Sequence, residues 1–310
     1  MEKRDTIHAL AFGEILWDII DNEPHIGGAP FNLAAHMAAL GGEVSIASAV
    51  GKDRLGSAAL EEVKHLGIDN SFINIHPQLA TGTVPVSLDA QGKPEYEIVE
   101  NVAWDAITLS DAALEAISKR NWDLFVFGTL AQRSKENRQV LRELVDHSNA
   151  GERFFDVNLR LSYYSAKILH DSLMLTTILK LNDEEVPIVS DALFSRTMRE
   201  EEFCKAIFDT FPVRMICITK GKDGSTLFDG KMRYDEPIVD IPVVDTVGAG
   251  DSFSAAFLTA YLKGLTKAKA LRFASRLSSF VAGSSGAVPA YTGWILDDIT
   301  AMKDSPDRRE

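Results

Sequence analysis

The sequence predicts an α/β protein in which a mostly parallel central sheet is covered by helices on both faces, giving three layers. Continuous apolar segments of strand length recur along the chain, and segments of helical character separate them. Residues 81–104 break this rhythm with two alternating segments around a turn, the pattern of an antiparallel hairpin. There is no repeat of fixed period and no linker rich in Gly, Ser or Pro, so residues 1–310 are expected to form a single domain with a small β-sheet lid.

The regular elements can be placed from their apolar runs and from the turn residues around them. Pro30 suits the first turn of a helix, and Gly41 suits its C-terminal end. Helices are expected over residues 30–40, about 54–66 and 135–147, and strands over 7–12, 44–50, 123–128, 153–160, 178–182 and 215–219. Polar residues follow several of these strands, and parallel α/β sheets bind ligands beyond the carboxyl ends of their strands.

The lid is expected from two separate stretches. Residues 83–88 and 95–99 alternate between apolar and polar side chains, with turn residues at 89–92. Together with residues 14–26 they are expected to form a small sheet that covers a site. Asp18 lies inside the apolar part of that first stretch. Its carboxyl group either needs a partner in a buried position or lies on the solvent face of a strand.

Composition and charge narrow the class of protein. Hydrophobic residues make up 45% of the chain, which allows a sizeable core, and the formal net charge of −13 argues against nonspecific binding to nucleic acids or anionic membranes. Cys204 and Cys217 each lie among apolar residues and are expected to be buried thiols in a reducing compartment. The apolar run at residues 7–12 is too short for the core of a signal peptide, and no run is long enough to span a membrane. We therefore expect a cytoplasmic protein.

The most informative stretch is residues 244–253, where an apolar run leads through Gly248-Ala249-Gly250 into a helical segment. Unpaired N–H groups at a helix N-terminus bind anions, and glycines let a phosphate approach them closely. A carboxylate at Asp251 would repel such an anion unless it takes a proton from the group that attacks it. The alternative is that Asp251 caps the helix.

Residues 245–251 resemble the C-terminal motif of the ribokinase-like (PfkB-type) carbohydrate kinases, Asp-Thr-x-Gly-Ala-Gly-Asp, at every fixed position. Residues 27–32, Gly-Gly-Ala-Pro-Phe-Asn, are similar to the family's sugar-side motif in the form found in fructokinase-like members. The resemblance spans nearly the whole chain. It implies the ribokinase-like three-layer fold, a lid over the sugar that often serves as a dimer surface, and ATP-dependent phosphorylation of a sugar.

The resemblance also assigns roles to individual residues. Asp251 would be the catalytic base, and the amides of Gly248, Ala249 and Gly250 would form the anion hole. The sugar-side candidates are Asp18, Gly28, Asn32, Arg133 and Arg160. The nucleotide-side candidates are Asn182, Thr219, Gly221, Gly224, Thr246 and Gly286. Glu185 would hold Mg²⁺ through water, and Asp245, Val247 and Gly286 match positions where some members hold a monovalent cation such as K⁺.

Simpler explanations exist for three of these candidates. Asn182 and Glu185 also suit the start of a helix, with Asn as the cap and an acid that complements the helix dipole. Asn32 could simply be exposed to solvent.

The resulting hypothesis is an ATP- and Mg²⁺-dependent sugar kinase that converts fructose to fructose 6-phosphate, with ribose or 2-keto-3-deoxygluconate as alternative acceptors. Residues 162–164 are Ser-Tyr-Tyr, where many relatives have a Trp, so the identity of the sugar is not fixed by the resemblance. A catalytically silent sugar-binding relative is a further alternative. A dinucleotide-dependent oxidoreductase is disfavoured because Gly13 is not part of a Gly-x-Gly-x-x-Gly motif. The expected partners are the sugar, ATP and a second copy bound through the lid.

Overall fold

The computed structural model describes residues 6–88, 94–239, 241–293, 295, 297–298 and 301, and these residues contain a nine-stranded central sheet. Its strands are β1 (His8–Phe12), β4 (Glu43–Gly51), β5 (Ile73–His76), β8 (Leu124–Gly128), β9 (Glu152–Asp156), β10 (Ile178–Asn182), β11 (Met215–Thr219), β12 (Ser225–Phe228) and β13 (Arg233–Glu236). Their spatial order is β13-β12-β11-β10-β9-β8-β1-β4-β5. All neighbouring pairs from β11 to β5 are parallel, and β12 and β13 extend one edge with antiparallel pairing.

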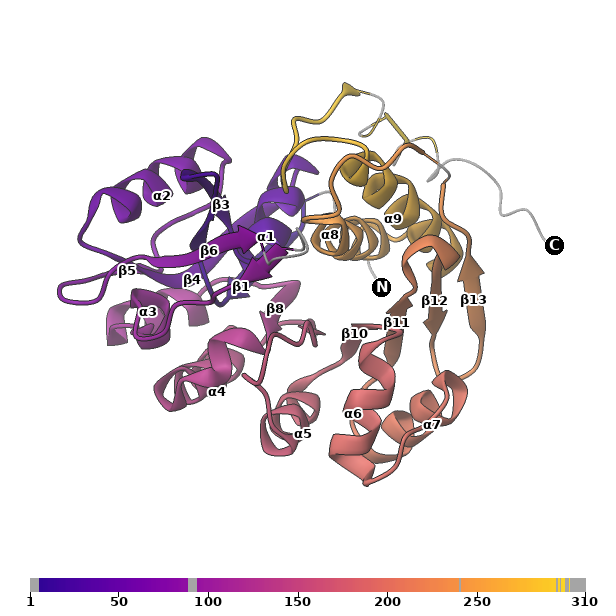
Figure 1. Ribbon diagram of the computed structural model, residues 1–310. Coiled ribbons are helices and arrows are strands. Elements are labelled where there is room, and N and C mark those ends of the chain that lie inside the picture. The colour runs from indigo at the N-terminus through magenta and orange to yellow at the C-terminus, as the bar shows by residue number, and fades with distance from the viewer. Residues whose placement is uncertain are drawn as a thin grey trace.

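Helices cover both faces of this sheet, so the predicted three-layer α/β architecture is confirmed (Figure 1). Side chains alternate across each strand: Ala9 and Ala11 of β1 join one core, while Leu10 and Phe12 join the other. The first core is closed by α1 (Ala29–Ala39), α2 (Arg54–His65), α8 (Ala249–Leu262) and α9 (Lys267–Ala282). The second is closed by α3 (Asp111–Ser118), α4 (Lys135–Ser148), α5 (Ala166–Leu175), α6 (Glu185–Phe194) and α7 (Glu200–Thr210).

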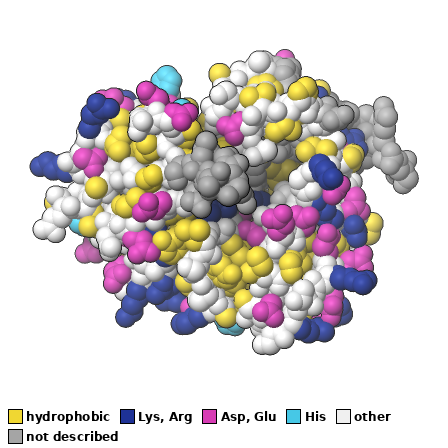
Figure 2. All heavy atoms as spheres, in the orientation of Figure 1, with side chains coloured by type: hydrophobic (Ala, Val, Ile, Leu, Met, Phe, Trp, Pro, Cys, Tyr) yellow, Lys and Arg dark blue, Asp and Glu magenta, His cyan; other side chains and the backbone are white. Residues whose placement is uncertain are grey.

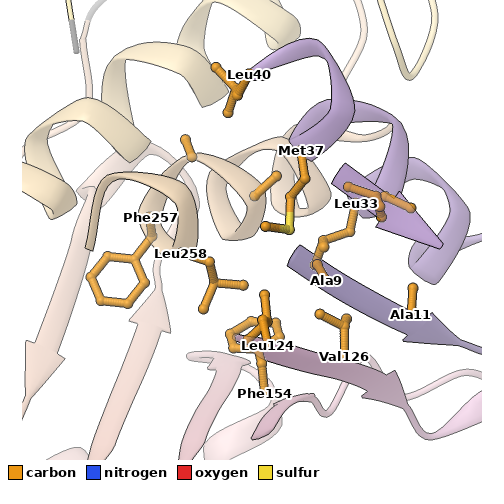
Figure 3. Close-up of a cluster of buried hydrophobic side chains, with 14 of the residues drawn as sticks. Ala9, Ala11, Leu33, Met37, Leu40, Leu124, Val126, Phe154, Phe257 and Leu258 are labelled. Carbon is orange, nitrogen blue, oxygen red and sulfur yellow. The ribbon is translucent and has the colours of Figure 1, made fainter. Parts of the chain in front are cut away.

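Helices α1 and α8 are far apart in the sequence but pack against each other over the middle of the sheet. Figure 3 shows Leu33 and Met37 of α1 above Ala9 of β1, with Leu258 of α8 beside them. Both helices are rich in small residues at this contact, which lets their axes approach closely. This packing brings the N-terminal turns of α1 and α8, which carry the two motifs, to the same edge of the sheet.

A separate four-stranded sheet, in the order β3-β2-β6-β7, contains the strands expected for the lid. It is formed by β2 (Leu16–Ile20), β3 (Glu23–Gly27), β6 (Gly82–Leu88) and β7 (Pro94–Tyr96), and β6 and β7 pair antiparallel. The expected turn at residues 89–92 lies outside the described residues. Strand β7 ends before the predicted residue 99, although the N–H groups of Glu97 and Val99 still donate to Pro85 and Thr83. A small apolar cluster around Trp104 lies beneath this sheet.

The strand predicted over residues 153–160 ends at Asp156, which is a correction to the sequence prediction. Asn158 and Leu161 adopt positive φ angles of 39° and 48°, which an extended strand does not allow. The N–H of Leu159 instead donates to the Glu185 side chain, at 2.6 Å. Arg160 therefore lies in a loop at the carboxyl edge of the sheet, not within a strand.

Both cysteines are buried, as the apolar residues around them in the sequence predict. Cys204 and Cys217 are buried free thiols, and burial raises the pKa of each. Among the residues that the structure describes, no helix combines the length and the apolar character needed to cross a membrane.

Candidate active site

The two sequence motifs meet through one hydrogen bond. Asn32, in the first turn of α1, donates from Nδ2 to Oδ2 of Asp251 in the first turn of α8, at 2.9 Å and across 219 residues of sequence. Asn32 is 5% exposed, so simple exposure to solvent does not explain this residue. Its Oδ1 is buried and has no hydrogen-bond partner among the described residues. The sugar-side motif and the Gly-Ala-Gly-Asp motif therefore form one site.

The N-terminus of α8 is built by glycine. Gly248 occupies the N-cap position with φ of 77°, in the left-handed region that glycine adopts without strain. No side chain caps this helix, and the Asp251 carboxylate faces Asn32 instead, so the capping alternative for Asp251 is wrong. The N–H of Ala249 donates to Thr246 and that of Ser252 donates to Gly248, while the N–H groups of Gly250 and Asp251 between them have no acceptor within the helix. The turn thus presents backbone donors and the positive end of the helix dipole.

The surroundings of Asp251 raise the pKa of its carboxyl group above the usual range of an aspartate. Burial raises the pKa of its carboxyl group to about 6, the hydrogen bond from Asn32 lowers it, and the nearby Asp156 carboxylate raises it further. Lys180 and Arg160 act in the opposite direction. A carboxyl group with such a pKa is largely ionised at pH 7 but is a much better base than an ordinary Asp.

A buried ion pair that the sequence reading did not identify lies beneath this turn. Lys180 Nζ contacts both carboxylate oxygens of Asp156 at 3.0 Å, and the two side chains are only 8% and 7% exposed. The ammonium lies 3.4 Å from where a Cβ on Gly250 would stand. Burial lowers the pKa of Lys180, but Asp156, Glu185 and Asp251 raise it more, so the ammonium stays charged. The signal was present in the sequence, because Lys180 is a charged residue in an otherwise apolar strand.

We expect Lys180→Met to lower the free energy of unfolding by roughly 3–5 kcal/mol, because it leaves the Asp156 carboxylate buried and unpaired. Urea unfolding measures the change. The double variant Lys180→Met/Asp156→Leu should recover most of it. Lys205→Met is the matched control, since its partner Asp209 and Lys205 itself are 63% and 76% exposed and such a pair contributes about 1 kcal/mol or less. Equal losses from Lys180→Met and Lys205→Met would contradict this prediction.

Asn182 and Glu185 form a reciprocal pair at the start of α6. The Asn182 side chain accepts from the N–H of Glu185, and the Glu185 carboxylate accepts from the N–H of Asn182, both at 2.8 Å. The second oxygen of Glu185 binds the N–H of Leu159. These bonds lie at the start of α6, as the helix-start explanation expects, but the N-cap residue is Glu184 and not Asn182. The same contacts fix a buried carboxylate near Lys180.

The donor set around Glu185 fits Mg²⁺ only through water. No group of three or more His, Cys, Asp or Glu suited to a metal ion occurs among the residues that the structure describes. Mg²⁺ characteristically keeps several waters and needs few carboxylates, so a single fixed Glu with free lone pairs suffices.

The nucleotide-side candidates lie along the neighbouring strand ends. Thr219 ends β11 in register with Asn182 of β10. Gly221 has φ of 51° and open space around its Cα, whereas a Cβ on Gly224 would come 2.2 Å from the Glu236 carbonyl oxygen. Gly221 is thus the glycine that leaves room for a ligand, and Gly224 is required by the turn itself.

The candidates for the monovalent cation belong to the loops around α8. The Asp245 carboxylate accepts from the N–H of Val247 at 2.9 Å, which closes a local turn, and its other oxygen remains available. Gly286 has φ of 80° and open space around its Cα. The backbone of Ala287 packs directly against Gly248.

The charge of Arg160 acts on both Asp18 of the smaller sheet and Asp251. Asp18 is partly buried on β2, and burial raises its pKa to about 6, while His25 and Arg160 lower it. A Cβ on Gly28 would come 2.4 Å from the Glu14 carbonyl oxygen, so only glycine fits there. Arg160 is exposed, and the one described hydrogen bond of its guanidinium goes to the carbonyl of the adjacent Leu159. Its guanidinium is therefore available to a ligand.

Glu14 is a second residue that sequence reasoning missed. It directly follows Gly13 at the end of β1, is 3% exposed, and lines a small pocket together with Asp156 and Asn158. Its Oε2 has no hydrogen-bond partner among the described residues. Burial raises the pKa of Glu14 to about 7, while its own N–H and the Arg160 charge lower it. The feature of the sequence that could have identified Glu14 is an acidic residue just after the carboxyl end of the first strand.

Arg133 is held in a different set of contacts. Its guanidinium binds both oxygens of Asp105 at 2.7 Å, donates to the Val99 carbonyl at 2.7 Å, and stacks over Trp104 and Tyr163. These contacts tie the segment after β7 to η2 (Leu130–Arg133). Only Nη1 lacks a hydrogen-bond partner within the described chain, so a sugar contact by Arg133 stays a prediction.

A wider groove lies at the opposite edge of the sheet, but its charged groups are paired with each other, as Asp69 is with Arg120 at 2.8 Å. Figure 2 shows acidic and basic side chains interspersed over much of the visible face, with several basic side chains gathered at its lower left.

Comparison with known proteins identifies the family. Residues 8–292 match the family described as pfkB family carbohydrate kinase. The chain belongs to the pfkB family of carbohydrate kinases. Ribokinase of Bacillus subtilis is 30% identical over 84% of this chain and 82% of its own length. Fructokinase of Escherichia coli is 26% identical over 76% of each chain.

A solved structure shows the same fold for this pfkB-family chain. Fructokinase of Xylella fastidiosa with bound ATP superposes with a TM-score of 0.82, covering 96% of this chain and 97% of its own, at 21% identity. At that identity the likeness concerns the fold alone. The protein is therefore a sugar kinase with the ribokinase-like architecture.

Proposed function

We propose that the protein transfers the γ-phosphoryl group of ATP to a primary hydroxyl of a monosaccharide, and that fructose is the acceptor and fructose 6-phosphate the product. The observation that carries the proposal is the hydrogen bond that joins Asn32 of the sugar-side motif to the Asp251 carboxylate. The form of residues 27–32 and the fructokinase relatives favour fructose over ribose or 2-keto-3-deoxygluconate.

Asp251 is the base in this proposal. An ionised Oδ accepts the proton of the attacking hydroxyl, and Asn32 keeps the carboxylate aimed at the substrate. The amides of Gly248 and Gly250 stabilise the charge on the transferring group, because they are fixed in place before the reaction. The Ala249 N–H, which donates to Thr246 at 3.3 Å, would turn to the same group when it binds. Lys180 lies below the same turn and adds positive charge without occupying the substrate's space.

Nucleotide and metal complete the proposed site. Thr219, Gly221, Gly224, Thr246 and Gly286 surround the proposed ATP position. Val243 and Val244 are about two-thirds exposed and offer apolar surface on which the adenine ring of ATP can pack. Mg²⁺, held through water by Glu185 beside Asn182, would neutralise phosphate charge when bound. Asp245, Val247 and Gly286 are the proposed ligands of a monovalent cation such as K⁺.

The sugar side is proposed to be Asp18, Gly28, Asn32, Glu14 and Arg160. A carboxylate that accepts two hydroxyl groups recognises a polyol well, since both bonds are charge-assisted. The β3-β2-β6-β7 sheet is the proposed lid over the sugar. Exposed Ile20 and Tyr96 on this sheet support a homodimer through the lid.

The direct test is a coupled ATP assay with Mg²⁺ on a panel of ketoses, pentoses and sugar acids. We expect fructose to give the highest kcat/KM. A higher value for a sugar acid would assign Arg160 to a substrate carboxylate and overturn fructose as the acceptor. Absence of turnover with every sugar, in protein shown to be folded and to bind ATP, would support the silent relative instead.

We expect Asp18→Ala to raise the KM for the sugar by about 10- to 100-fold and to leave the KM for ATP unchanged, because it removes hydrogen bonds from a charged acceptor. Steady-state kinetics with each substrate varied measure both constants. Glu23→Ala, an exposed residue of the neighbouring strand β3, is the control and should change neither. An unchanged sugar KM in Asp18→Ala would remove Asp18 from the site.

The pH dependence follows from the Asp251 pKa of about 6. A general base works only when ionised, so kcat/KM should be level above pH 7 and fall about tenfold per pH unit below pH 6. Two other acids titrate nearby, Asp18 near 6 and Glu14 near 7, so the profile is repeated in Asp18→Asn and Glu14→Gln. Both variants should keep the acid limb, and a flat profile from pH 7 to pH 5 would contradict the assignment to Asp251.

A further inference from the structure

Helix α1 reaches the candidate site with two residues, one turn apart. Asn32 contacts Asp251, and His36, four residues later, lies on the same side of the helix. His36 is fully buried. Its Nε2 lies 2.9 Å from the carbonyl oxygen of Ala287, and its Nδ1 lies 2.5 Å from the hydroxyl of Tyr291. The imidazole thus joins α1 to the loop that follows α9.

The chemistry of these partners fixes the proton positions. A carbonyl oxygen can only accept, so Nε2 carries the hydrogen and donates it to Ala287. Burial lowers the pKa of His36 to about 4, so the ring is neutral at physiological pH and Nδ1 accepts from the Tyr291 hydroxyl. Burial also raises the pKa of Tyr291, which keeps that hydroxyl protonated. The two rings stack with centroids 5.8 Å apart and planes 13° apart.

The carbonyl that His36 holds is the one that packs against the Gly-Ala-Gly turn. A Cβ on Gly248 would come 2.5 Å from the Ala287 oxygen and 2.8 Å from its Cα. Ala287 therefore forms the wall behind the N-cap of α8. Movement of this carbonyl by even a few tenths of an ångström changes the space available to Gly248, whose left-handed conformation sets the direction of the following amides.

We propose that His36 is a positioning residue: through the Ala287 carbonyl it holds the 284–291 loop against Gly248, so the helix that carries the sugar-side Asn32 also sets the geometry of the anion hole. The proposal rests on the proposed role of the Gly248–Gly250 amides in phosphoryl transfer. It differs from a packing role because it places the effect in one hydrogen bond, the one from Nε2 to Ala287.

Two variants separate that bond from the loss of the ring. In His36→Gln the side-chain amide nitrogen takes the place of Nε2 and can still donate to Ala287. In His36→Asn the shorter side chain reaches the position of Nδ1, so it can accept from Tyr291 but cannot reach Ala287. Both variants lose the stacking on Tyr291. We expect kcat within about threefold of wild type for the Gln variant and a loss on the order of tenfold or more for the Asn variant, since small misplacements at a reacting centre have large effects.

The readouts are kcat, the two KM values and the melting temperature. The sugar KM should stay unchanged in both variants, because Asn32 and Asp251 are untouched. Met37→Ala is the control: it is the next residue of α1, is fully buried, and packs into the core toward β1 (Figure 3). It should lower the melting temperature but leave kcat at 20 °C unchanged. Tyr291→Phe removes only the contact at Nδ1 and leaves the Nε2 bond to Ala287 intact, so its kcat should stay within about threefold of wild type. If neither His36 variant folds, NMR of the wild type with ¹⁵N-labelled histidine decides, because the proposed bond requires the Nε2–H tautomer and slow exchange of that proton.

Three results would overturn the positioning role. One is equal kcat in the Gln and Asn variants, and the second is a kcat loss that follows the melting temperature across all variants including Met37→Ala. The third is an Nδ1–H tautomer, or a freely exchanging Nε2–H, in the wild type. If the wild type turns over no sugar, the proposed function fails separately. ATP binding by calorimetry then tests the inference, and a weaker affinity in His36→Asn than in His36→Gln is the expected result.

Discussion

Asp251→Asn is expected to lower kcat on the order of 10²- to 10⁴-fold and to leave the sugar KM within a few-fold of wild type. The amide keeps the size of the carboxylate and can still accept the hydrogen bond from Asn32 through its oxygen. It cannot take up the proton of the attacking hydroxyl. A coupled ATP assay gives kcat, and calorimetry shows whether sugar binding is retained.

The same substitution is expected to stabilise the fold. A buried carboxyl group whose pKa rises from 3.8 to about 6 holds its proton more tightly in the folded chain than in the unfolded chain. Between these pKa values stability falls as pH rises, and at pH 7 the ionised group costs about 3 kcal/mol at 1.36 kcal/mol per unit. Asn carries no charge and avoids this cost. The melting temperature of Asp251→Asn should therefore exceed that of wild type at pH 7 and match it near pH 4.

Near-normal kcat in Asp251→Asn would defeat the assignment of the base. A loss of both activity and stability would instead mean that the substitution disturbs α8, and then the kinetic result alone could not support the base. Asn32→Ala provides a second measurement, since it removes the donor to Asp251 and should lower kcat less than Asp251→Asn does.

Gly248→Ala is expected to lower kcat on the order of 10²-fold, the size of effect seen when an oxyanion donor is displaced. The new Cβ would meet the Ala287 carbonyl oxygen at 2.5 Å and the Ala287 Cα at 2.8 Å, both backbone atoms that cannot rotate away. Either the 284–291 loop or the first turn of α8 must move. The sugar KM should change little, because Asp18 lies on another element.

Gly230→Ala is the matched control for this substitution. Gly230 has φ of 80°, close to the 77° of Gly248, but a Cβ there meets no atom within 4 Å. It carries the same left-handed strain, about 1–2 kcal/mol, without the steric contact. Similar melting temperatures with a kcat loss only in Gly248→Ala would assign the effect to the position of the anion-hole amides. Equal kcat in the two variants would exclude it.

Sequence reasoning predicted the layers of the fold because each strand carries its own signal. Ile178 to Asn182 and Met215 to Thr219 read as apolar runs that end in polar residues, and both strands have those bounds. The strand predicted over residues 153–160 was too long, because the positive φ at Asn158 that ends it is set by tertiary contacts. Nothing local to residues 157–160 shows that Glu185 will take the N–H of Leu159.

The site was predictable where residues act within a motif and unpredictable where they act across strands. Gly248 and Asp251 follow from the chemistry of a glycine-rich helix start. Lys180 and Asp156 could not be paired in advance, because their contact depends on the register between β9 and β10. Glu14 and Arg133 show the same limit: one acid is left with an unpaired oxygen, and one cation is taken up by Asp105.

The packing of α1 on α8 has a consequence for how the protein is made. Leu33 and Met37 leave the ribosome early in synthesis, but Phe257 and Leu258, which cover the same core, follow only some 220 residues later. Until then the nascent chain must carry an uncovered apolar helix, a state that invites aggregation or chaperone binding. Catalytic competence and completion of the core should therefore arise in a single late step of biosynthesis.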